Sequence, residues 1–142
     1  MPVIRATAFA VVASLLSSLA LAAEKPFTGV FSGYGRACFG GLFVRTKTIE
    51  WNSPFSVCKP TQYDVLEKNA EGEKERIVFQ LRKHFKRCGL AVIEIENAQT
   101  EDDRWDVTGY QTLESYQKRH EPEWADSVLD DRMTFYCSMF RL

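Results

Sequence analysis

The chain has few of the residues on which catalysis most often depends. It contains only two histidines among 142 residues, and no serine lies in the Gly-x-Ser-x-Gly pattern of a hydrolase nucleophile. Its four cysteines include no Cys-x-x-Cys pair of the kind that redox enzymes use. Gly33 and Gly35 lack the third glycine of a dinucleotide-binding loop, because Cys38 holds that position. We therefore expect no enzyme activity and no cofactor.

The two histidines lie in charged surroundings of opposite sign. His84 lies in the basic stretch 82–87, and His120 is followed by Glu121 and Glu123. Positive neighbours disfavour protonation of His84, and His120 has no second strong ligand at metal-binding spacing. We predict that both are solvated loop residues and that there is no metal site. An anion contact, such as a lipid phosphate, is the alternative for 82–87, and an enzyme that uses either histidine is the least favoured reading.

The chain also lacks a strong net charge and long apolar runs in its main part. The formal net charge is −1, which argues against binding to nucleic acid or to an anionic membrane. No apolar run beyond residue 23 reaches the roughly 20 residues that a membrane-spanning helix needs. We expect no nucleic-acid partner and no stable membrane anchor.

The N-terminal residues do form an apolar segment. Arg5 precedes a run of apolar and small residues that continues to Ala22, which is the pattern of a secretory signal peptide. We predict a leader over 1–22 that is cleaved after Ala22, with Ala23 as the next best site and an uncleaved anchor as the weaker alternative. The remainder, 23–142, is then a single periplasmic or secreted domain.

The cysteines predict a covalent framework, because an exported chain meets an oxidising compartment. Cys38, Cys58, Cys88 and Cys137 allow three pairings. We favour Cys38–Cys58, which would tie neighbouring segments, and Cys88–Cys137, which would join the last strand to one beginning near Cys88. Zinc is disfavoured because no two cysteines have the short spacing that zinc ligands favour.

Most of the chain after the leader shows strand-like alternation. The clearest case is 76–82, where Ile77, Phe79 and Leu81 share one face. Breaks are predicted at Lys59–Pro60 and at a hairpin loop over 69–74. Strands are predicted over 27–35, 42–51, 63–67, 76–82, 88–96, 105–110 and 133–140.

Two further signals complete the predicted fold. Glycines cluster around Cys38, which indicates bends or close backbone approaches in a sheet. Helical spacing appears only over 113–124, with Thr112 as a candidate cap and Pro122 as the end. We predict a mainly β fold, a small antiparallel β-barrel or sandwich with one short helix, stapled by two disulfides.

Aromatic and acidic residues near the C-terminus are the candidate binding residues. Trp51 and Trp105 fit a small core, whereas Trp124 lies among acidic residues and is predicted to be partly exposed. The acidic segment 121–131 and the basic stretch 82–87 give a polarised surface that suits a protein partner. The candidate contact residues are Glu121, Glu123, Trp124 and Asp126.

These observations favour a binding protein over an enzyme. Our hypothesis is an extracytoplasmic binding protein, in the form of an inhibitor or immunity-type factor for another extracytoplasmic protein, by analogy of fold class. The alternative is a carrier of a small ligand or lipid with an apolar cavity, which a core filled by Phe79, Leu81, Ile93 and Phe135 would exclude. A structural envelope protein is the third option.

Overall fold

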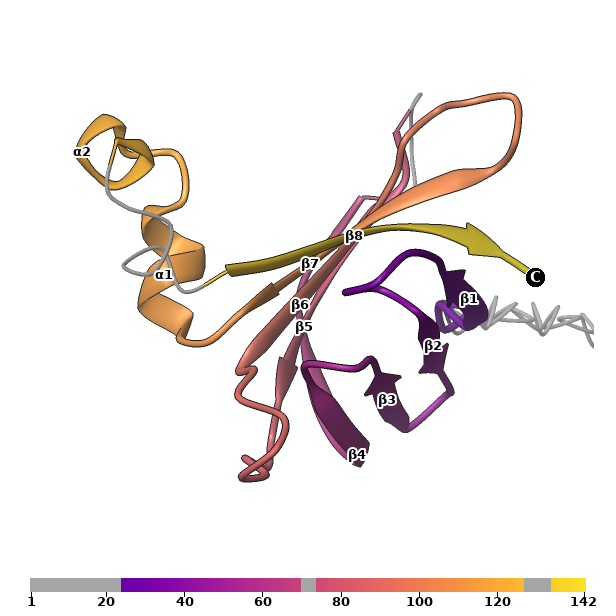
Figure 1. The fold of residues 1–142 in the computed structure, drawn as a ribbon, viewed down its shortest axis with the longest axis horizontal. Coiled ribbons are helices and arrows are strands. Elements are labelled where there is room, and N and C mark those ends of the chain that lie inside the picture. The colour runs from indigo at the N-terminus through magenta and orange to yellow at the C-terminus, as the bar shows by residue number, and fades with distance from the viewer. Residues whose placement is uncertain (1–23, 70–73, 127–133) are drawn as a thin grey trace, which may run out of the picture.

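The fold is a closed antiparallel β-barrel in which every strand pairs with its neighbours in sequence order and the last strand pairs with the first. The computed structural model describes residues 24–69, 74–126 and 134–142, so the predicted signal peptide lies outside the described residues. Two short helices lie together outside the sheet (Figure 1). The strands are β1 (Gly29–Gly33), β2 (Gly40–Val44), β3 (Thr48–Asn52), β4 (Val57–Asn69), β5 (Arg76–Leu81), β6 (Val92–Asn97), β7 (Arg104–Tyr110) and β8 (Thr134–Arg141), and the helices are α1 (Leu113–Lys118) and α2 (Pro122–Ala125). The predicted mainly β fold is confirmed, and of the two predicted architectures the barrel is found.

Side chains that point inward at every second position of the strands fill the interior of the barrel. Ile77, Phe79 and Leu81 of β5 all point into the core, as the period-two pattern predicted. Trp51 and Trp105 are fully buried there, which confirms them as core residues. Such aromatic side chains fill most of the interior of a small barrel because each buries a large apolar area.

Two strand boundaries differ from the sequence prediction. The predicted single strand over 42–51 is a hairpin, since the Arg45 N–H donates to the Thr48 carbonyl (2.8 Å) and the chain reverses between β2 and β3. The predicted break at Lys59–Pro60 is wrong, because β4 runs through it. There Lys59 and Pro60 together lie opposite Glu50 alone, and such a bulge tolerates a proline that has no N–H to donate.

Close backbone approach explains two of the glycines near Cys38. A Cβ on Gly33 would lie 2.0 Å from the Cys38 carbonyl oxygen, and one on Gly40 would lie 1.9 Å from that of Asn52. Gly40 also has a φ of +138°, which side chains of L-residues rarely adopt. These contacts let the first hairpin turn tightly at one end of the barrel.

The helices cover part of the outer wall instead of closing the barrel. The hydroxyl of Thr112 accepts a hydrogen bond from the Ser115 N–H (3.0 Å) and caps α1, as predicted. Tyr116 of α1 then packs with Val78, Val92 and Tyr110 on the outside of β5 to β7. The predicted single helix is two, because α1 ends at Lys118 and Pro122 begins α2.

Both disulfides are present, but the favoured pairing is wrong. The bonds join Cys38 to Cys137 and Cys58 to Cys88. Closure of the barrel puts β1 beside β8, so the turn after β1 meets Cys137 of the last strand. The pairing of β4 with β5 brings the loop after β5 back to Cys58. Two disulfides are consistent with an oxidising, extracytoplasmic environment.

Candidate protein-binding end of the barrel

Three loops at one end of the barrel are held in place by disulfides and hydrogen bonds. In an up-and-down barrel, the connections that follow odd-numbered strands all lie at the same end. Four connections do so here. Three of them, the β1–β2 loop (34–39), the β3–β4 turn (53–56) and the β5–β6 loop (82–91), are together called the braced end. The fourth, between β7 and β8, carries α1 and α2. The two disulfides attach to it, since Cys38 and Cys88 lie in two of its loops.

The β3–β4 turn is closed by hydrogen bonds between its first and last residues. The N–H of Ser53 donates to the Ser56 carbonyl (2.9 Å). The hydroxyl of Ser53 accepts from the Ser56 N–H (3.0 Å) and donates to the Ser56 carbonyl (3.2 Å). Both serines are buried, so the turn has little freedom, and it leaves Phe55 at its tip 72% exposed.

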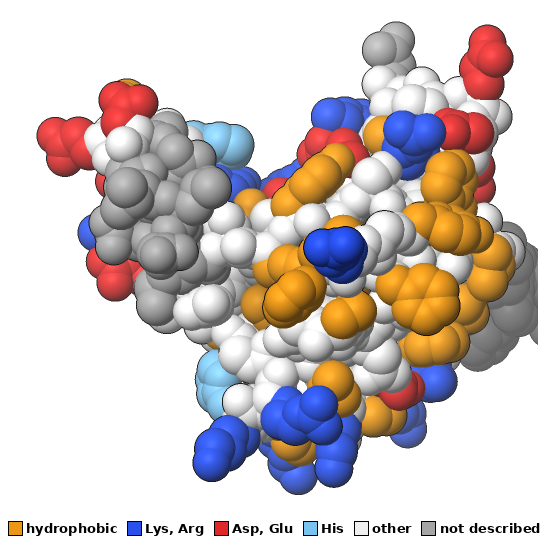
Figure 2. Space-filling model, in the orientation of Figure 1, with side chains coloured by type: hydrophobic (Ala, Val, Ile, Leu, Met, Phe, Trp, Pro, Cys, Tyr) orange, Lys and Arg blue, Asp and Glu red, His pale blue; other side chains and the backbone are white. Residues whose placement is uncertain are grey.

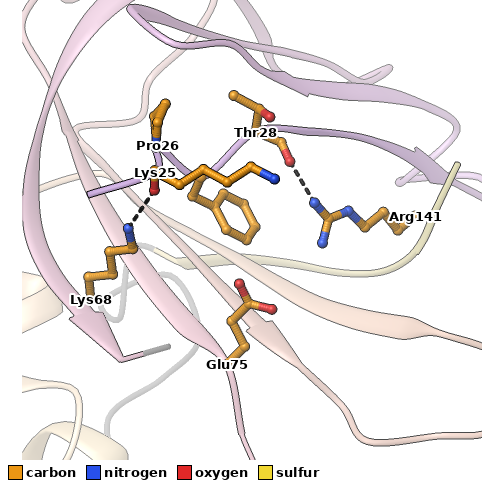
Figure 3. Close-up of a pocket in the computed structure, with 7 residues that line it drawn as sticks. Lys25, Pro26, Thr28, Lys68, Glu75 and Arg141 are labelled. Carbon is orange, nitrogen blue, oxygen red and sulfur yellow. Dashed lines mark hydrogen bonds between the residues drawn. The ribbon is translucent and has the colours of Figure 1, made fainter. Parts of the chain in front are cut away.

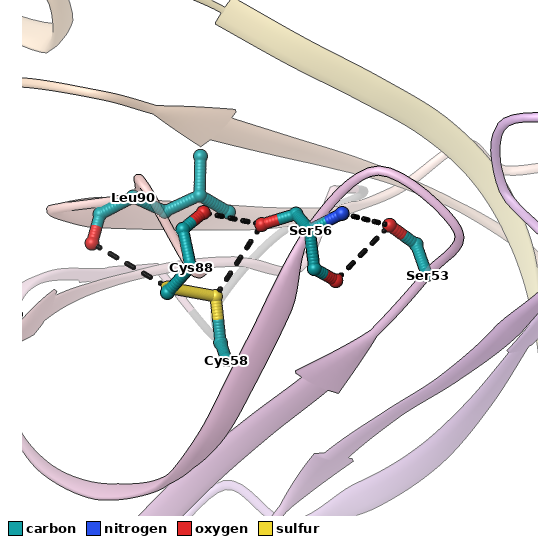
Figure 4. Close-up of a disulfide and its surroundings, with 5 residues drawn as sticks. All are labelled: Ser53, Ser56, Cys58, Cys88 and Leu90. Carbon is teal, nitrogen blue, oxygen red and sulfur yellow. Dashed lines mark hydrogen bonds between the residues drawn. A yellow bond between two sulfur atoms is a disulfide. The ribbon is translucent and has the colours of Figure 1, made fainter. Parts of the chain in front are cut away.

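The same turn is fixed to the β5–β6 loop by three links. The hydroxyl of Ser56 donates to the Cys88 carbonyl, and the disulfide joins Cys58 to Cys88 (Figure 4). The N–H of Val57 donates to the Arg87 carbonyl (3.0 Å). The Phe55 side chain is therefore held in the solvent by a rigid support, beside the cationic residues that precede Cys88.

A second exposed phenylalanine lies on the neighbouring loop. Phe39 is 70% exposed. It lies next to Gly40, whose Cα is close to the Asn52 carbonyl at the start of the β3–β4 turn. The disulfide of Cys38 to Cys137 holds this loop to β8. Exposed aromatic residues on rigid loops are the usual anchors of protein interfaces.

The three loops of the braced end carry positive charge and no carboxylate. Its loops contain Arg36, Lys83, Lys86 and Arg87, none of which forms an ion pair with another described residue. Arg82 does, through a salt bridge of 2.6 Å to Asp64. Lys and Arg side chains gather at the lower edge of the molecule, where the β5–β6 loop lies (Figures 1 and 2). The prediction of a solvated basic stretch over 82–87 agrees with this exposure.

A shallow hollow lies beside Phe55. Its volume is about 340 Å³, and Phe55, Lys86, Arg87, Leu90 and Phe135 are among the residues that line it. The wall is apolar near Leu90 and Phe135 and cationic at Lys86 and Arg87. This geometry fits an acidic partner surface that also presents an apolar side chain.

Of the residues that the sequence singled out, His84 lies in the β5–β6 loop of the braced end, and the others lie between β7 and β8. His84 and His120 are exposed, as predicted. Trp124 is half-buried in α2, with the Lys118 ammonium 5.6 Å from its ring centre. Glu121, Glu123 and Asp126 are exposed beside it, and the rest of the acidic segment, 127–131, lies outside the described residues. The structure thus places the predicted contact residues in and next to α2, in the β7–β8 connection that leaves the same end of the barrel but is not one of the three loops of the braced end.

A charged network that the sequence did not reveal joins α1 to the barrel wall. Arg76 of β5 pairs with Glu67 and Glu94 of the neighbouring strands and donates to the Tyr116 hydroxyl (3.0 Å). The hydrogen bonds from Tyr116 and Arg76 hold the pKa of the Glu67 carboxyl below its usual range. Burial raises the pKa of Tyr110, which donates to Glu94. All these groups are engaged with one another, so the network holds α1 in place.

Comparisons with known proteins add no family to these findings. No family model, no curated protein and no solved structure matches the chain. Among the residues that the structure describes, no three His, Cys, Asp or Glu side chains are grouped as metal ligands, and no helix there has the length and apolar character needed to cross a membrane.

Proposed function

We propose that the protein is a non-catalytic binding protein of the periplasm or the extracellular space, and that it holds a protein partner through the braced end. An inhibitor or immunity-type factor for an extracytoplasmic protein is the form that we favour. The observation that carries the proposal is the rigid display of Phe55, on a turn linked to the β5–β6 loop by a disulfide and two hydrogen bonds.

Rigidity supports binding because association costs less when the contact groups are already fixed. Ordering a flexible side chain or loop costs about 0.5–1.5 kcal/mol per immobilised side chain. The β3–β4 turn of the braced end is already ordered in the free protein, because hydrogen bonds between Ser53 and Ser56 close it and its aromatic tip points outward. Phe55 is exposed next to a hollow that Phe135 also lines, and aromatic side chains in such a position are enriched at protein interfaces.

The charges define the partner further. Lys86 and Arg87 line the hollow beside Phe55, and the three loops contain no carboxylate, so these loops attract an acidic surface and repel a basic one. The acidic residues beside Trp124 remain a second contact candidate, in the β7–β8 connection that leaves the same end of the barrel. The partner that this end fits is acidic and has an apolar pocket for one phenyl ring.

The carrier alternative is the weaker proposal. Phe79, Leu81 and Ile93 are buried in the core, and Phe135 packs against it. These side chains occupy the space that a ligand inside the barrel would need, and cores are packed almost without voids. Packing therefore favours contact through the outside of the molecule.

A capture experiment with charge variants tests the proposal. The mature protein is immobilised, exposed to extracytoplasmic extract of its source cells and washed with increasing salt. We expect one retained protein, which is released by salt and lost from the variant Phe55→Asp with Lys86→Glu. Lys47→Glu, an exposed change in the β2–β3 loop at the opposite end, is the matched control and should retain it. Equal retention by wild type and the braced-end variant would refute the proposal.

A further inference from the structure

The opposite end of the barrel contains a small charged hollow. The N-terminal segment before β1 crosses this end, and Phe27 packs into the barrel against Phe31, Phe79 and Trp105. A cavity of about 230 Å³ remains above it. The cavity is lined by Lys25, Pro26, Phe27, Thr28, Lys68, Glu75 and Arg141 (Figure 3).

Arg141 is fixed at this hollow without a carboxylate partner. Its guanidinium lies 5.3 Å from the ring centres of both Phe27 and Trp105. One of its nitrogens donates to the Thr28 carbonyl (2.6 Å). Among the described residues it forms no ion pair, so the charge is held by aromatic faces and a single carbonyl, and its remaining donors are available.

Two more charged groups face the same space. The Glu75 carboxylate and the Lys25 ammonium reach toward the region between the labelled side chains (Figure 3). Neither forms a side-chain hydrogen bond or ion pair with another described residue. Lys68, by contrast, is engaged by the Glu24 carboxylate (3.3 Å) and the Lys25 carbonyl (3.1 Å). The groups open to a ligand are therefore two cations and one carboxylate.

We propose that this hollow binds a small zwitterion, a molecule with one carboxylate and one ammonium group as in amino acids and short peptides. The ligand carboxylate binds Arg141 and Lys25, the ammonium binds Glu75, and the apolar part lies against Phe27. A simple anion leaves Glu75 unpaired, and a simple amine leaves the two cations unpaired, so only a ligand with both charges satisfies all three groups. The site is separate from the braced end and does not depend on the function proposed for it.

A nuclear magnetic resonance titration of the mature protein tests this site. Leucine and glycylglycine are the zwitterionic probes, with a shorter and a longer distance between their charges. 4-Methylpentanoate and isoamylamine each lack one of the two charges of leucine. We expect at least one zwitterion to shift the amide signals of Phe27, Thr28, Glu75 and Arg141, and to bind about tenfold or more tightly than either singly charged analogue.

Variants separate the two halves of the site. Glu75→Gln is expected to remove the preference for leucine over 4-methylpentanoate, while Arg141→Gln and Lys25→Gln each weaken zwitterion binding about tenfold. Lys47→Gln, in the β2–β3 loop at the same end but outside the lining, should bind as wild type does. Because Arg141 also packs on core aromatics, Lys25→Gln and Glu75→Gln keep the test valid if Arg141→Gln unfolds. Shifts that are equal for all four probes, or unchanged in the Glu75 and Lys25 variants, would overturn the proposal.

Discussion

The hydroxyl of Ser56 donates a hydrogen bond to the carbonyl of Cys88, which lies 32 residues further along the chain. The two residues belong to different loops of the braced end, and both are buried. One short polar side chain thus joins the turn that carries Phe55 to the loop that carries the cations. The stability of this contact and the ability to bind a partner should change together.

Replacement of Ser56 by alanine tests that contact. Ser56→Ala leaves the buried Cys88 carbonyl without its donor, and such an unsatisfied group costs about 1–3 kcal/mol. Urea unfolding followed by tryptophan fluorescence should show this loss in the free energy of unfolding. Thr46→Ala, an exposed change in the β2–β3 loop, is expected to stay within about 0.5 kcal/mol of wild type. A Ser56→Ala variant as stable as Thr46→Ala would show that the bond contributes nothing.

The two disulfides should differ in their contribution to stability. The Cys38–Cys137 bond closes a chain segment with a sequence separation of 99, and Cys58–Cys88 one of 30. Loop-closure entropy predicts that replacing the first pair by serines costs about 4–5 kcal/mol and the second about 3–4 kcal/mol. Denaturant unfolding of each double variant measures the costs, and peptide mapping under non-reducing conditions checks the pairing. Recovery of a Cys38–Cys58 peptide would contradict the barrel closure described above.

Acid should weaken the attachment of α1. The pKa of Glu67 is lower in the folded protein than the ordinary value of 4.5, because of its hydrogen bonds from Tyr116 and Arg76. A lowered folded-state pKa gives stability that is present above the unfolded-state pKa and is lost as the pH falls through the folded-state value. We therefore expect the stability difference between wild type and Glu67→Gln to shrink as the pH is lowered from 6 to below about 4. A difference that is constant over this range, measured by thermal unfolding, would mean that Glu67 does not contribute through its charge.

Gly40 should tolerate no side chain. Gly40→Ala would place a Cβ 1.9 Å from the Asn52 carbonyl oxygen at a φ of +138°, so the backbone of the first hairpin has to move. We expect a loss of several kcal/mol, above the roughly 1 kcal/mol of an ordinary substitution. Gly35→Ala provides the comparison, because no atom lies within 4 Å of its Cβ position although its φ is also positive. Equal losses in the two variants would assign the effect to backbone conformation alone.

The sequence was sufficient for the fold class because the signals that define it are local. Ile77, Phe79 and Leu81 alternate within one strand, and the Thr112 hydroxyl caps α1 by accepting from the N–H of Ser115, three residues away. The disulfide pairing was not accessible in this way. It depends on β8 meeting β1 after the whole chain has passed around the barrel, and no pattern within one segment records that closure.

The candidate sites also combine features that the sequence shows locally with contacts that only the fold creates. The basic stretch 82–87 was visible in the sequence, but the position of Phe55 follows from three links between its turn and that later loop. Arg141 and Glu75 meet at the other end only because β8 and β5 reach the same rim of the barrel. The acidic residues around Trp124 stood out in the sequence because they are contiguous, and contiguity carries no information about which surfaces the fold brings together.

The ladder between β1 and β8 is short, since it pairs only Phe31, Ser32 and Gly33 with Arg141, Phe140 and Met139. This seam would be the natural place for a barrel to unzip. The sulfur bridge from Cys38 to Cys137 lies next to the ladder on the side away from the termini, so separation of the two strands that starts from the termini stops at this bridge. A protease or a mechanical load that acts on the termini therefore meets a covalent stop at the inner end of this ladder, and Cys137 stays joined to the loop after β1 even when the three pairs separate.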